Sequence, residues 1–466
     1  MTTDLVYLAF AFAALAVFRW RPPAEAALAV FLGGWVLLPV GHFPLGSADV
    51  EFPYWITGLA VPSDMLLTKA WVAPAAAVLG LLVFDRAALL RLRPVWMDAP
   101  VLLWCAWPLL QAITVAEARP MGALASLYLA GAWGLPWLLG RACFASSEAR
   151  LLLVKGLALA GLACLPIALV EGVFGPVFYG AVYEPHPFRF DGIVRYIGYR
   201  PLGFFEDGNQ YGLWVSLCAL AAVWLALALP AGRDAQRWRV VAGIDVAMAL
   251  VAQSVGGILL LVLGIAFLFV CRWLRPRWML AAVAALLVFG GAAYVSGVVP
   301  IARIGKETAL GRHVIDAFRS VGRGSFTWRI GQDQKLLPDA MARPLVGTAL
   351  WDWWRPKSIR PWGLTVLVLG QFGLIGLLAC LGTFAWPAFA AAWRAPAGSA
   401  WRLSALPLLL AAIAGLTLVD ALMNSFVFFP ALIVAGALAV SNASAAPAAR
   451  PRVRGEITRI PRRRNA

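Results

Sequence analysis

The chain has 466 residues, of which 62% are hydrophobic and 13% charged, and its formal net charge is +16. Its mean hydropathy is +0.80, whereas a soluble globular domain has about a quarter of its residues charged. This composition excludes an ordinary soluble protein. Apolar runs of roughly 17–25 residues recur along the chain, and the alternating segments of a transmembrane β-barrel are not evident. The sequence therefore predicts an all-α, polytopic bundle of about 12–13 transmembrane helices.

Arginines set the predicted orientation of these spans. They recur in the links that follow odd-numbered spans, and Lys and Arg in short loops favour the cytoplasmic side. We therefore expect the N-terminus outside and the C-terminus inside. The first apolar run is interpreted as a span because no basic segment of a signal peptide precedes it. The predicted spans lie near 4–18, 26–43, 68–85, 98–115, 120–140, 151–173, 209–229, 239–254, 257–271, 278–297, 364–385, 403–421 and 424–441.

The spans form one predicted membrane domain, residues 1–441, with two large loops, 174–208 and 298–362, on the outer side. A basic tail, residues 442–466, is expected to be cytoplasmic and disordered. Residues 450–466 hold seven Arg and one Glu, a pattern that favours an anionic lipid surface. We therefore expect the lipid bilayer as a partner and no nucleic acid.

The longer outer loop, 298–362, is basic, with eleven Arg or Lys against five Asp or Glu. Long loops escape the orientation rule, so this charge needs another reason, and an anionic substrate would supply one. From Trp328 to Met341 the pattern predicts an amphipathic helix at the membrane surface. Arg329 and Arg343 are therefore candidate ligands of an anion, or cations that reach toward lipid headgroups.

The shorter outer loop, 174–208, contains Arg195 and Arg200 ahead of the seventh span. A guanidinium is permanently charged and binds phosphate with two parallel hydrogen bonds, which suits a pyrophosphate ligand. The alternative is that Arg200 pairs with Glu206 or Asp207 and closes the loop.

Several side chains are candidates for moving a proton. Glu206 and Asp207 lie beside Arg200, and His313 in the long loop titrates near neutral pH. His186, between two prolines in the shorter loop, is a candidate of the same kind. Asp245 lies inside a predicted span, where a carboxylate is costly, and we expect it to pair with another helix, for instance through Lys155.

Signatures of nucleotide, metal and redox chemistry are missing from the sequence. There is no P-loop, no metal-ligand cluster, no GxSxG elbow and no dinucleotide fingerprint. The six cysteines have no CxxC spacing and lie in or beside apolar runs. We therefore expect neither a cofactor nor a metal.

Three stretches resemble the O-antigen ligase and Wzy-type polymerase superfamily. The likeness covers roughly residues 150–440, where many spans surround two outer loops. The stretches are Arg200-Pro201-Leu202-Gly203-Phe204-Phe205 running into Gly208-Asn209, Trp328-Arg329 followed by Ala342-Arg343-Pro344-Leu345-Val346-Gly347, and Leu367-Val368-Leu369-Gly370-Gln371-Phe372-Gly373-Leu374-Ile375-Gly376.

The resemblance implies a bacterial inner-membrane glycosyltransferase that works at the periplasmic face. An undecaprenyl-pyrophosphate-linked glycan would be its substrate, and other polysaccharide assembly proteins would be its partners. Arg200 and Arg329 would bind the pyrophosphate leaving group while an acceptor hydroxyl attacks the anomeric carbon.

The chain departs from the family in two places. Ligases have a His-Asn pair where this chain reads Arg360-Pro361-Trp362-Gly363, and Ser-Arg at the short outer turn that here reads Ser254-Val255-Gly256-Gly257. We therefore favour a polysaccharide polymerase over a ligase to lipid A core. A lipid-linked-sugar transporter and a non-catalytic scaffold are the other hypotheses.

Overall fold

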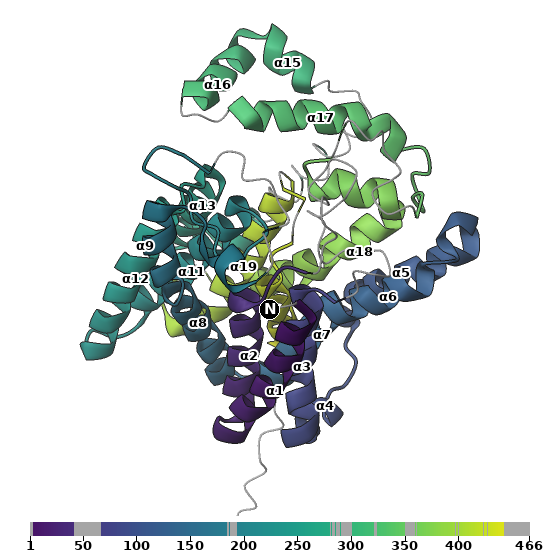
Figure 1. Cartoon of the computed structure of the whole chain (residues 1–466). Helices are drawn as coiled ribbons and strands as arrows, with labels where there is room; N and C mark the ends of the chain where they lie inside the picture. Colours follow the sequence, from purple (N-terminus) through teal and green to yellow (C-terminus); the bar gives the residue numbers. More distant parts are fainter. Residues whose placement is uncertain are drawn as a thin grey trace, which may run out of the picture.

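A computed structural model describes most of the chain as helices joined by loops (Figure 1). The structure describes residues 3–41, 67–183, 186, 193–279, 281, 285, 289, 301–320, 324–349, 359, 361–396, 398, 400–422, 424–425 and 427–441. The predicted tail and parts of both predicted outer loops lie outside these ranges.

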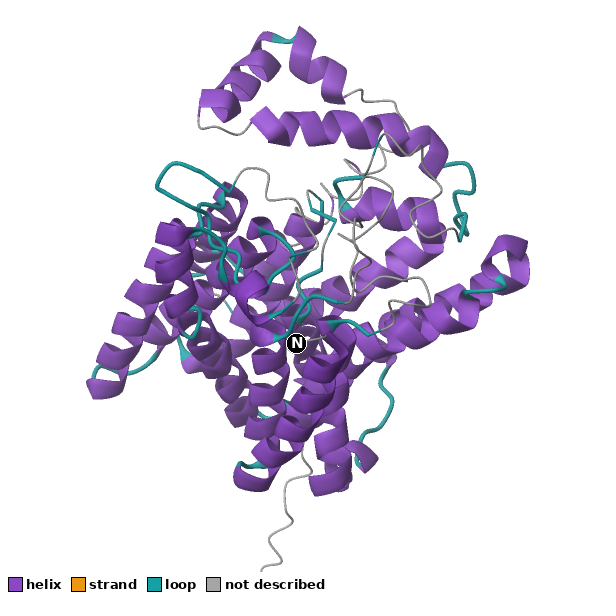
Figure 2. Cartoon of the chain, viewed as in Figure 1, coloured by secondary structure: helices purple, strands orange, loops and turns teal. Residues whose placement is uncertain are grey.

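The first half of the chain forms a bundle of apolar helices. Figure 2 shows that loops between them are mostly short. The elements are α1 (Thr3–Trp20), α2 (Pro23–Leu37), α3 (Lys69–Phe84), α4 (Arg86–Leu90), η3 (Trp96–Asp98), α5 (Ala99–Thr114), η4 (Ala116–Ala118), α6 (Gly122–Leu129), the π-helical turn η5 (Ala130–Gly134), α7 (Leu135–Cys143), α8 (Ser147–Leu162), α9 (Leu165–Phe174) and α10 (Phe178–Val182).

The second half adds the central helix of the bundle and a separate layer of three helices. In Figure 1 this layer, α15 to α17, lies above the bundle, at the opposite end from α4. The elements are α11 (Gly208–Ala228), α12 (Arg233–Val251), α13 (Val255–Val270), α15 (Ile301–Glu307), α16 (Ala309–Ser320), α17 (Gly324–Ala340), α18 (Leu364–Arg394), η6 (Leu403–Ala405), α19 (Leu406–Ala421) and α20 (Pro430–Ser441).

The protein is an all-α, multi-pass membrane protein, as predicted. Within the described residues, six helical segments are long and apolar enough to cross a membrane, and four shorter apolar helices accompany them. The only β pairing in these residues is two isolated bridges. The predicted span 278–297 falls largely outside the described residues, so the total of thirteen spans stays a prediction.

Some predicted boundaries are wrong. The span expected at 239–254 belongs to a helix, α12, that already begins at Arg233, and the span expected from 424 becomes helical only at Pro430. Proline favours the first position of a helix because its missing N–H has no helical partner there and its φ is already helical. The start of α20 is therefore set by a local signal within an otherwise uniform apolar run.

α11 is the centre of the bundle. It packs against α8, α12 and α13, and its side chains are buried along almost its whole length. A membrane helix that is apolar on every side can face lipid or other helices, and α11 is surrounded by other helices. This packing fixes the N-terminal end of α11, at Gly208, within the group of polar residues described below.

α18 is interrupted at Gly373, whose φ of 69° and ψ of −173° are not helical. The segment 344–349 runs beside this interruption, and the Thr348 N–H donates a 3.0 Å hydrogen bond to the Gly370 carbonyl. Irregular backbone at membrane depth must find such partners within the protein. The long loop thus returns to the bundle by pairing with a broken helix.

We call the end of the bundle below α15–α17 the loop face. It includes the segment 193–207, the turn 252–254 between α12 and α13, and the N-terminal end of α18. The helix predicted from Trp328 to Met341 is confirmed as α17, with bounds Gly324–Ala340.

Candidate functional site

The segment 200–207 lies on the loop face and is fixed by buried polar side chains. The Glu171 carboxylate, on α9, is fully buried and accepts hydrogen bonds from the N–H groups of Leu202 (2.8 Å) and Gly203 (2.7 Å). Its other oxygen accepts a bond of 3.0 Å from the Phe178 N–H. Buried carboxylates require such partners, so Glu171 fixes the first half of the segment.

Lys69 and His186 fix the second half of the segment. The buried ammonium of Lys69 donates to the Phe204 carbonyl at 2.8 Å, and it lies 4.6 Å from the centroid of the Phe205 ring and 4.7 Å from that of Trp35. His186, with Nε2 protonated, donates to the Phe205 carbonyl at 3.0 Å. Burial lowers the pKa of His186 to about 4, so its ring is neutral at neutral pH.

Glu206 and Asp207, predicted as proton acceptors, lie at the start of α11. Glu206 is buried, and its N–H donates to the side-chain oxygen of Gln210 at 3.0 Å. Asp207 is the N-cap of α11 and accepts from the N–H groups of Asn209 (2.8 Å) and Gln210 (2.7 Å). The structure thus gives Asp207 a capping role, and a catalytic role for either residue stays a prediction.

Arg200 lies beneath this segment and is only 5% exposed. Its Nε donates to the Ala252 carbonyl at 3.3 Å, and its Nη2 donates to the Asn209 side-chain oxygen at 2.9 Å. The guanidinium packs on Gly208, where a Cβ atom would lie 2.3 Å from Arg200 Nε. Glycine at this position therefore leaves the space that the arginine occupies.

A short hairpin, residues 193–200, leads into Arg200 and is held by Gln253. The Arg195 N–H donates to the Gly198 carbonyl at 3.1 Å and closes the turn. The Gln253 side chain accepts from the Ile197 N–H (3.0 Å) and donates to the Ile197 carbonyl (2.8 Å). Gln253 has a φ of 49°, which is uncommon for a residue with a side chain. The turn after α12 thus fixes the hairpin, including Arg195.

Arg329 reaches down from α17 to the bundle. Its Nη1 donates to the Asn424 side-chain oxygen at 2.7 Å, and its Cζ lies 4.7 Å from the centroid of the Trp362 ring. The rings of Trp328 and Trp362 meet with centroids 5.3 Å apart and an interplanar angle of 63°. Arg329 thus contacts the Asn424 amide and the face of the Trp362 ring.

Asp333, one turn after Arg329, fastens α17 to α18. Its two carboxylate oxygens accept from the N–H groups of Trp362 (2.7 Å) and Gly363 (2.9 Å) at the start of α18. Burial raises the pKa of Asp333 to about 6, although both hydrogen bonds and the Arg329 charge lower it. Asp333 thereby positions the tryptophan on which Arg329 stacks.

Two carboxylates connect the surroundings of the two arginines. Asn209, which accepts a hydrogen bond from Arg200, donates from its side chain to Asp207 at 3.3 Å. Asn424, which accepts one from Arg329, donates from its side chain to Asp420 at 2.7 Å. Asp420, at the end of α19, is 6% exposed and interacts electrostatically with both Asp207 and Arg329. We call these four residues (Asn209, Asp207, Asp420, Asn424) the Asn–Asp bridge: hydrogen bonds join Asn209 to Asp207 and Asn424 to Asp420, and the two carboxylates are near enough for their charges to repel.

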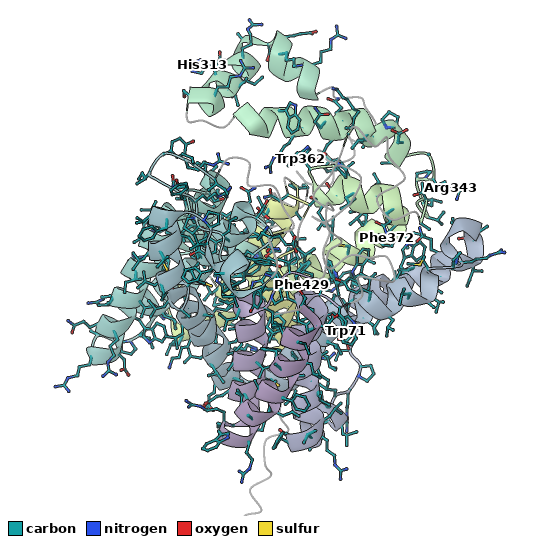
Figure 3. The ribbon with its side chains drawn as sticks, in the orientation of Figure 1. Trp71, His313, Arg343, Trp362, Phe372 and Phe429 are labelled. Atoms are coloured by element: carbon teal, nitrogen blue, oxygen red, sulfur yellow. The ribbon has the colours of Figure 1, made fainter. Side chains whose placement is uncertain are left out.

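Two predicted site residues lie elsewhere. His313 is exposed on α16 and Arg343 is exposed after α17. In Figure 3 both lie apart from Trp362, the residue on which Arg329 stacks. The structure does not bring His313 or Arg343 to the bridge.

The predicted partner of Asp245 is wrong. Asp245 is fully buried in α12, and among the described residues its carboxylate oxygens have no hydrogen-bond partner and no ion pair with Lys155. It packs on Gly161, where a Cβ atom would lie 3.3 Å from Oδ2. The sequence predicts an intramembrane carboxylate correctly and its neighbour incorrectly.

Sequence reasoning did not single out Lys69, Glu171, Gln253 or Asn424. Lys69 begins an apolar helix and Glu171 lies near the end of another, so an isolated charge in a predicted span was a usable signal. Gln253 and Asn424 are neutral amides, and nothing in the sequence separates them from other polar residues at helix ends.

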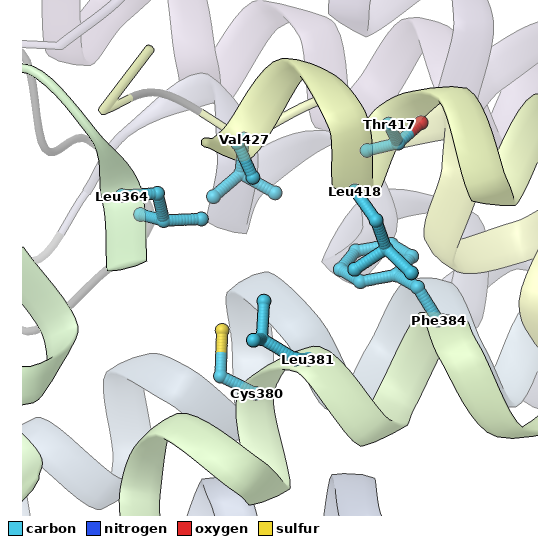
Figure 4. Close-up of a pocket in the computed structure, with 8 residues that line it drawn as sticks. Leu364, Cys380, Leu381, Phe384, Thr417, Leu418 and Val427 are labelled. Carbon is cyan, nitrogen blue, oxygen red and sulfur yellow. The ribbon is translucent and has the colours of Figure 1, made fainter. Parts of the chain in front are cut away.

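A small apolar pocket lies between α18 and α19, close to the start of α18 (Figure 4). Leu364 and Val427 line its end nearest the loop face, and Cys380, Phe384 and Leu418 line the rest. Such a lining suits hydrocarbon and offers no polar group for catalysis apart from the Thr417 hydroxyl.

No known family model matches the chain, and no curated protein matches it. In the part of the chain that the structure describes, no group of three His, Cys, Asp or Glu side chains is placed to hold a metal ion.

The cluster combines two fixed guanidinium groups, two amides and two carboxylates at one end of a membrane bundle. Fixed cations stabilise an anion without reorganising when it binds, and carboxylates can accept a proton. The arrangement therefore suits a ligand that has a strongly anionic group and an ionisable hydroxyl nearby.

Proposed function

We propose that the protein is a membrane glycosyltransferase that polymerises oligosaccharide repeats linked to undecaprenyl pyrophosphate, in the bacterial inner membrane. The observation that supports it is the Asn–Asp bridge, whose two amides accept hydrogen bonds from Arg200 and Arg329, arginines from loops that are far apart in the sequence. We assign the loop face to the periplasm because α4, which begins at Arg86 and is followed by Arg91 and Arg93, lies at the opposite end.

The two arginines suit a pyrophosphate that becomes the leaving group. Arg200 is almost fully buried and remains charged because guanidinium does not deprotonate in proteins. As the bond between the anomeric carbon and the pyrophosphate oxygen breaks, negative charge develops on that oxygen. Cations that are already oriented stabilise this charge more than they stabilise the bound donor.

The bridge also offers an acceptor for the proton of the attacking hydroxyl. In the proposed step the hydroxyl oxygen bonds to the anomeric carbon, the pyrophosphate leaves with the electron pair, and the hydroxyl proton goes to a carboxylate. Asp420 is the better candidate because Asp207 accepts three N–H donors, two of them backbone groups of the helix that it caps, whereas among the described residues Asp420 accepts one, from the Asn424 side chain.

Reconstituted elongation tests this function. Purified protein in nanodiscs would be given a lipid-linked repeat unit, and chain length would be followed by gel electrophoresis and mass spectrometry. Wild type should lengthen the chain, and Arg200→Gln and Arg329→Gln should not. Arg319→Ala, an exposed arginine of the same loop, is the matched control. Failure of a folded wild type to lengthen any lipid-linked repeat would contradict the proposed activity.

A lipid-linked-sugar transporter is the second candidate, and the broken helix α18 favours it. Discontinuous helices that end at membrane depth are typical of transporters, and Gly373 interrupts α18 in this way. A fluorescent lipid-linked oligosaccharide in liposomes separates the two functions. A transporter moves the probe between leaflets without changing its length, and a polymerase changes its length.

A further inference from the structure

Two tryptophans form a partly open aromatic pair beside Arg329. Trp328 is 51% exposed, and its ring meets that of Trp362 at a centroid distance of 5.3 Å. Trp362 is half-buried and stacks on the Arg329 guanidinium. Trp328 therefore presents aromatic surface to the outside, and the second ring connects that surface to the candidate anion site.

Polar contacts fix this pair in place. The backbone N–H of Trp362 donates to Asp333, whose other oxygen accepts from Gly363, so the start of α18 fixes the inner ring. On α17, Leu336, Leu337 and Ala340 are buried against the bundle and fix the helix that contains the outer ring. A tryptophan that only marks the membrane surface needs no such support, because lipid and water satisfy it.

The ring of Trp328 has the features of a sugar-binding surface. Pyranose rings present a face of C–H groups, and these groups stack on the electron-rich face of an indole. Gln332 lies one helical turn after Trp328 and is half-buried, so its amide is on the same side of α17 and can bond sugar hydroxyls. Binding sites commonly combine an apolar surface with few polar groups in this way.

We propose that Trp328 and Trp362 form an aromatic subsite for a sugar ring, adjacent to the anion held by Arg329. The subsite rests on the proposed function, since it assigns to these rings the sugar that is attached to, or approaches, the lipid pyrophosphate. The exposed ring of Trp328 contacts the sugar, and Trp362 supports it and orients Arg329.

Affinity for two probes tests the subsite separately from the function. The probes are undecaprenyl pyrophosphate without sugar and the same lipid with one N-acetylglucosamine, each titrated into the full chain in nanodiscs by calorimetry. Trp328→Ala should bind the sugar-bearing probe roughly three- to tenfold more weakly and the sugar-free probe as wild type does. Trp328→Phe should keep most of the affinity. Trp273→Ala is the matched control because Trp273 is 60% exposed, meets Phe269 edge to face, and lies just after α13, away from the proposed subsite in the sequence.

The other possible results of these titrations contradict either the sugar subsite or the pyrophosphate site. Equal affinity of wild type and Trp328→Ala for the sugar-bearing probe would overturn the subsite, and so would an equal loss for both probes. Binding of neither probe by wild type would instead overturn the pyrophosphate site. The subsite would then be tested by saturation-transfer NMR with N,N′-diacetylchitobiose. Loss of the transfer signal of the disaccharide in Trp328→Ala supports the subsite, and an unchanged signal overturns it.

Discussion

Arg329 donates a 2.7 Å hydrogen bond to Asn424, a residue 95 positions later in the chain. The Asn424 side chain in turn donates to Asp420 at 2.7 Å, and the Asn424 backbone carbonyl accepts the N–H of Leu364, the first residue of α18, at 3.1 Å. One residue thus joins the layer of helices above the loop face to two helices of the bundle. The position of Arg329 depends on this amide.

Asn424→Ala should weaken pyrophosphate binding. The change removes the acceptor of Arg329 and the donor to Asp420, and hydrogen bonds to charged groups contribute about 1.5–3 kcal/mol each. We expect affinity for undecaprenyl pyrophosphate to fall roughly 10–100-fold, measured by calorimetry in nanodiscs. Wild-type affinity in a folded Asn424→Ala protein would show that Arg329 is positioned by other contacts.

Gly208→Ala should damage the site more than the fold. The added Cβ would lie 2.3 Å from Arg200 Nε, so the guanidinium must move away from Asn209. Gly415→Ala is the matched control, because that helical glycine has no atom within 4 Å of the added Cβ. Elongation rate and melting temperature would be measured for both. Equal activity of the two variants would contradict the assigned position of Arg200.

Gly373→Ala should destabilise the protein. An alanine at a φ of 69° costs about 1–3 kcal/mol, and its Cβ would lie 2.4 Å from the Leu345 carbonyl. We expect a lower melting temperature than in Gly415→Ala and a weaker attachment of residues 344–349, measured by hydrogen exchange. If Gly373→Ala melts like the control, α18 is not broken at this residue.

The stability that Asp333 contributes should depend on pH. Because its pKa is raised to about 6 in the folded protein from an unfolded value of about 3.9, the folded state binds the proton more tightly. Stability relative to Asp333→Asn should therefore decrease as pH rises from about 4 to about 6, and then stay constant. Melting temperatures of both proteins between pH 4 and 8 would measure this. A difference that grows with rising pH would have the wrong sign.

The sequence predicts parts of this site because their signal is local. Arg200 lies close to Gly198 and Gly203 in the shorter predicted loop, Arg329 directly follows Trp328 in the basic longer one, and the helix that contains Arg329 follows from its periodicity. The capping role of Asp207 also has a local basis, since Asp directly precedes a long apolar helix. These features need no knowledge of how distant helices pack.

The remaining features depend on contacts between distant segments. Lys69 bonds a carbonyl 135 residues away, and Asn424 bonds an arginine 95 residues away, so no spacing in the sequence marks either residue. His313 has suitable chemistry but lies in the outer layer, and only the packing of α16 reveals this. The fold class follows from composition because every span must satisfy its own backbone, whereas the site depends on which helix ends meet.

The affinity of the purified protein for undecaprenyl pyrophosphate tests the central claim most directly. Arg200→Gln and Arg329→Gln should each lower this affinity roughly 10–100-fold, while Arg319→Ala should bind as wild type does. Because Arg200 is buried and hydrogen-bonded, its replacement should also lower the melting temperature, so affinities are compared below the melting temperature of each variant. Wild-type affinity in either glutamine variant would contradict a single pyrophosphate site built by the two loops.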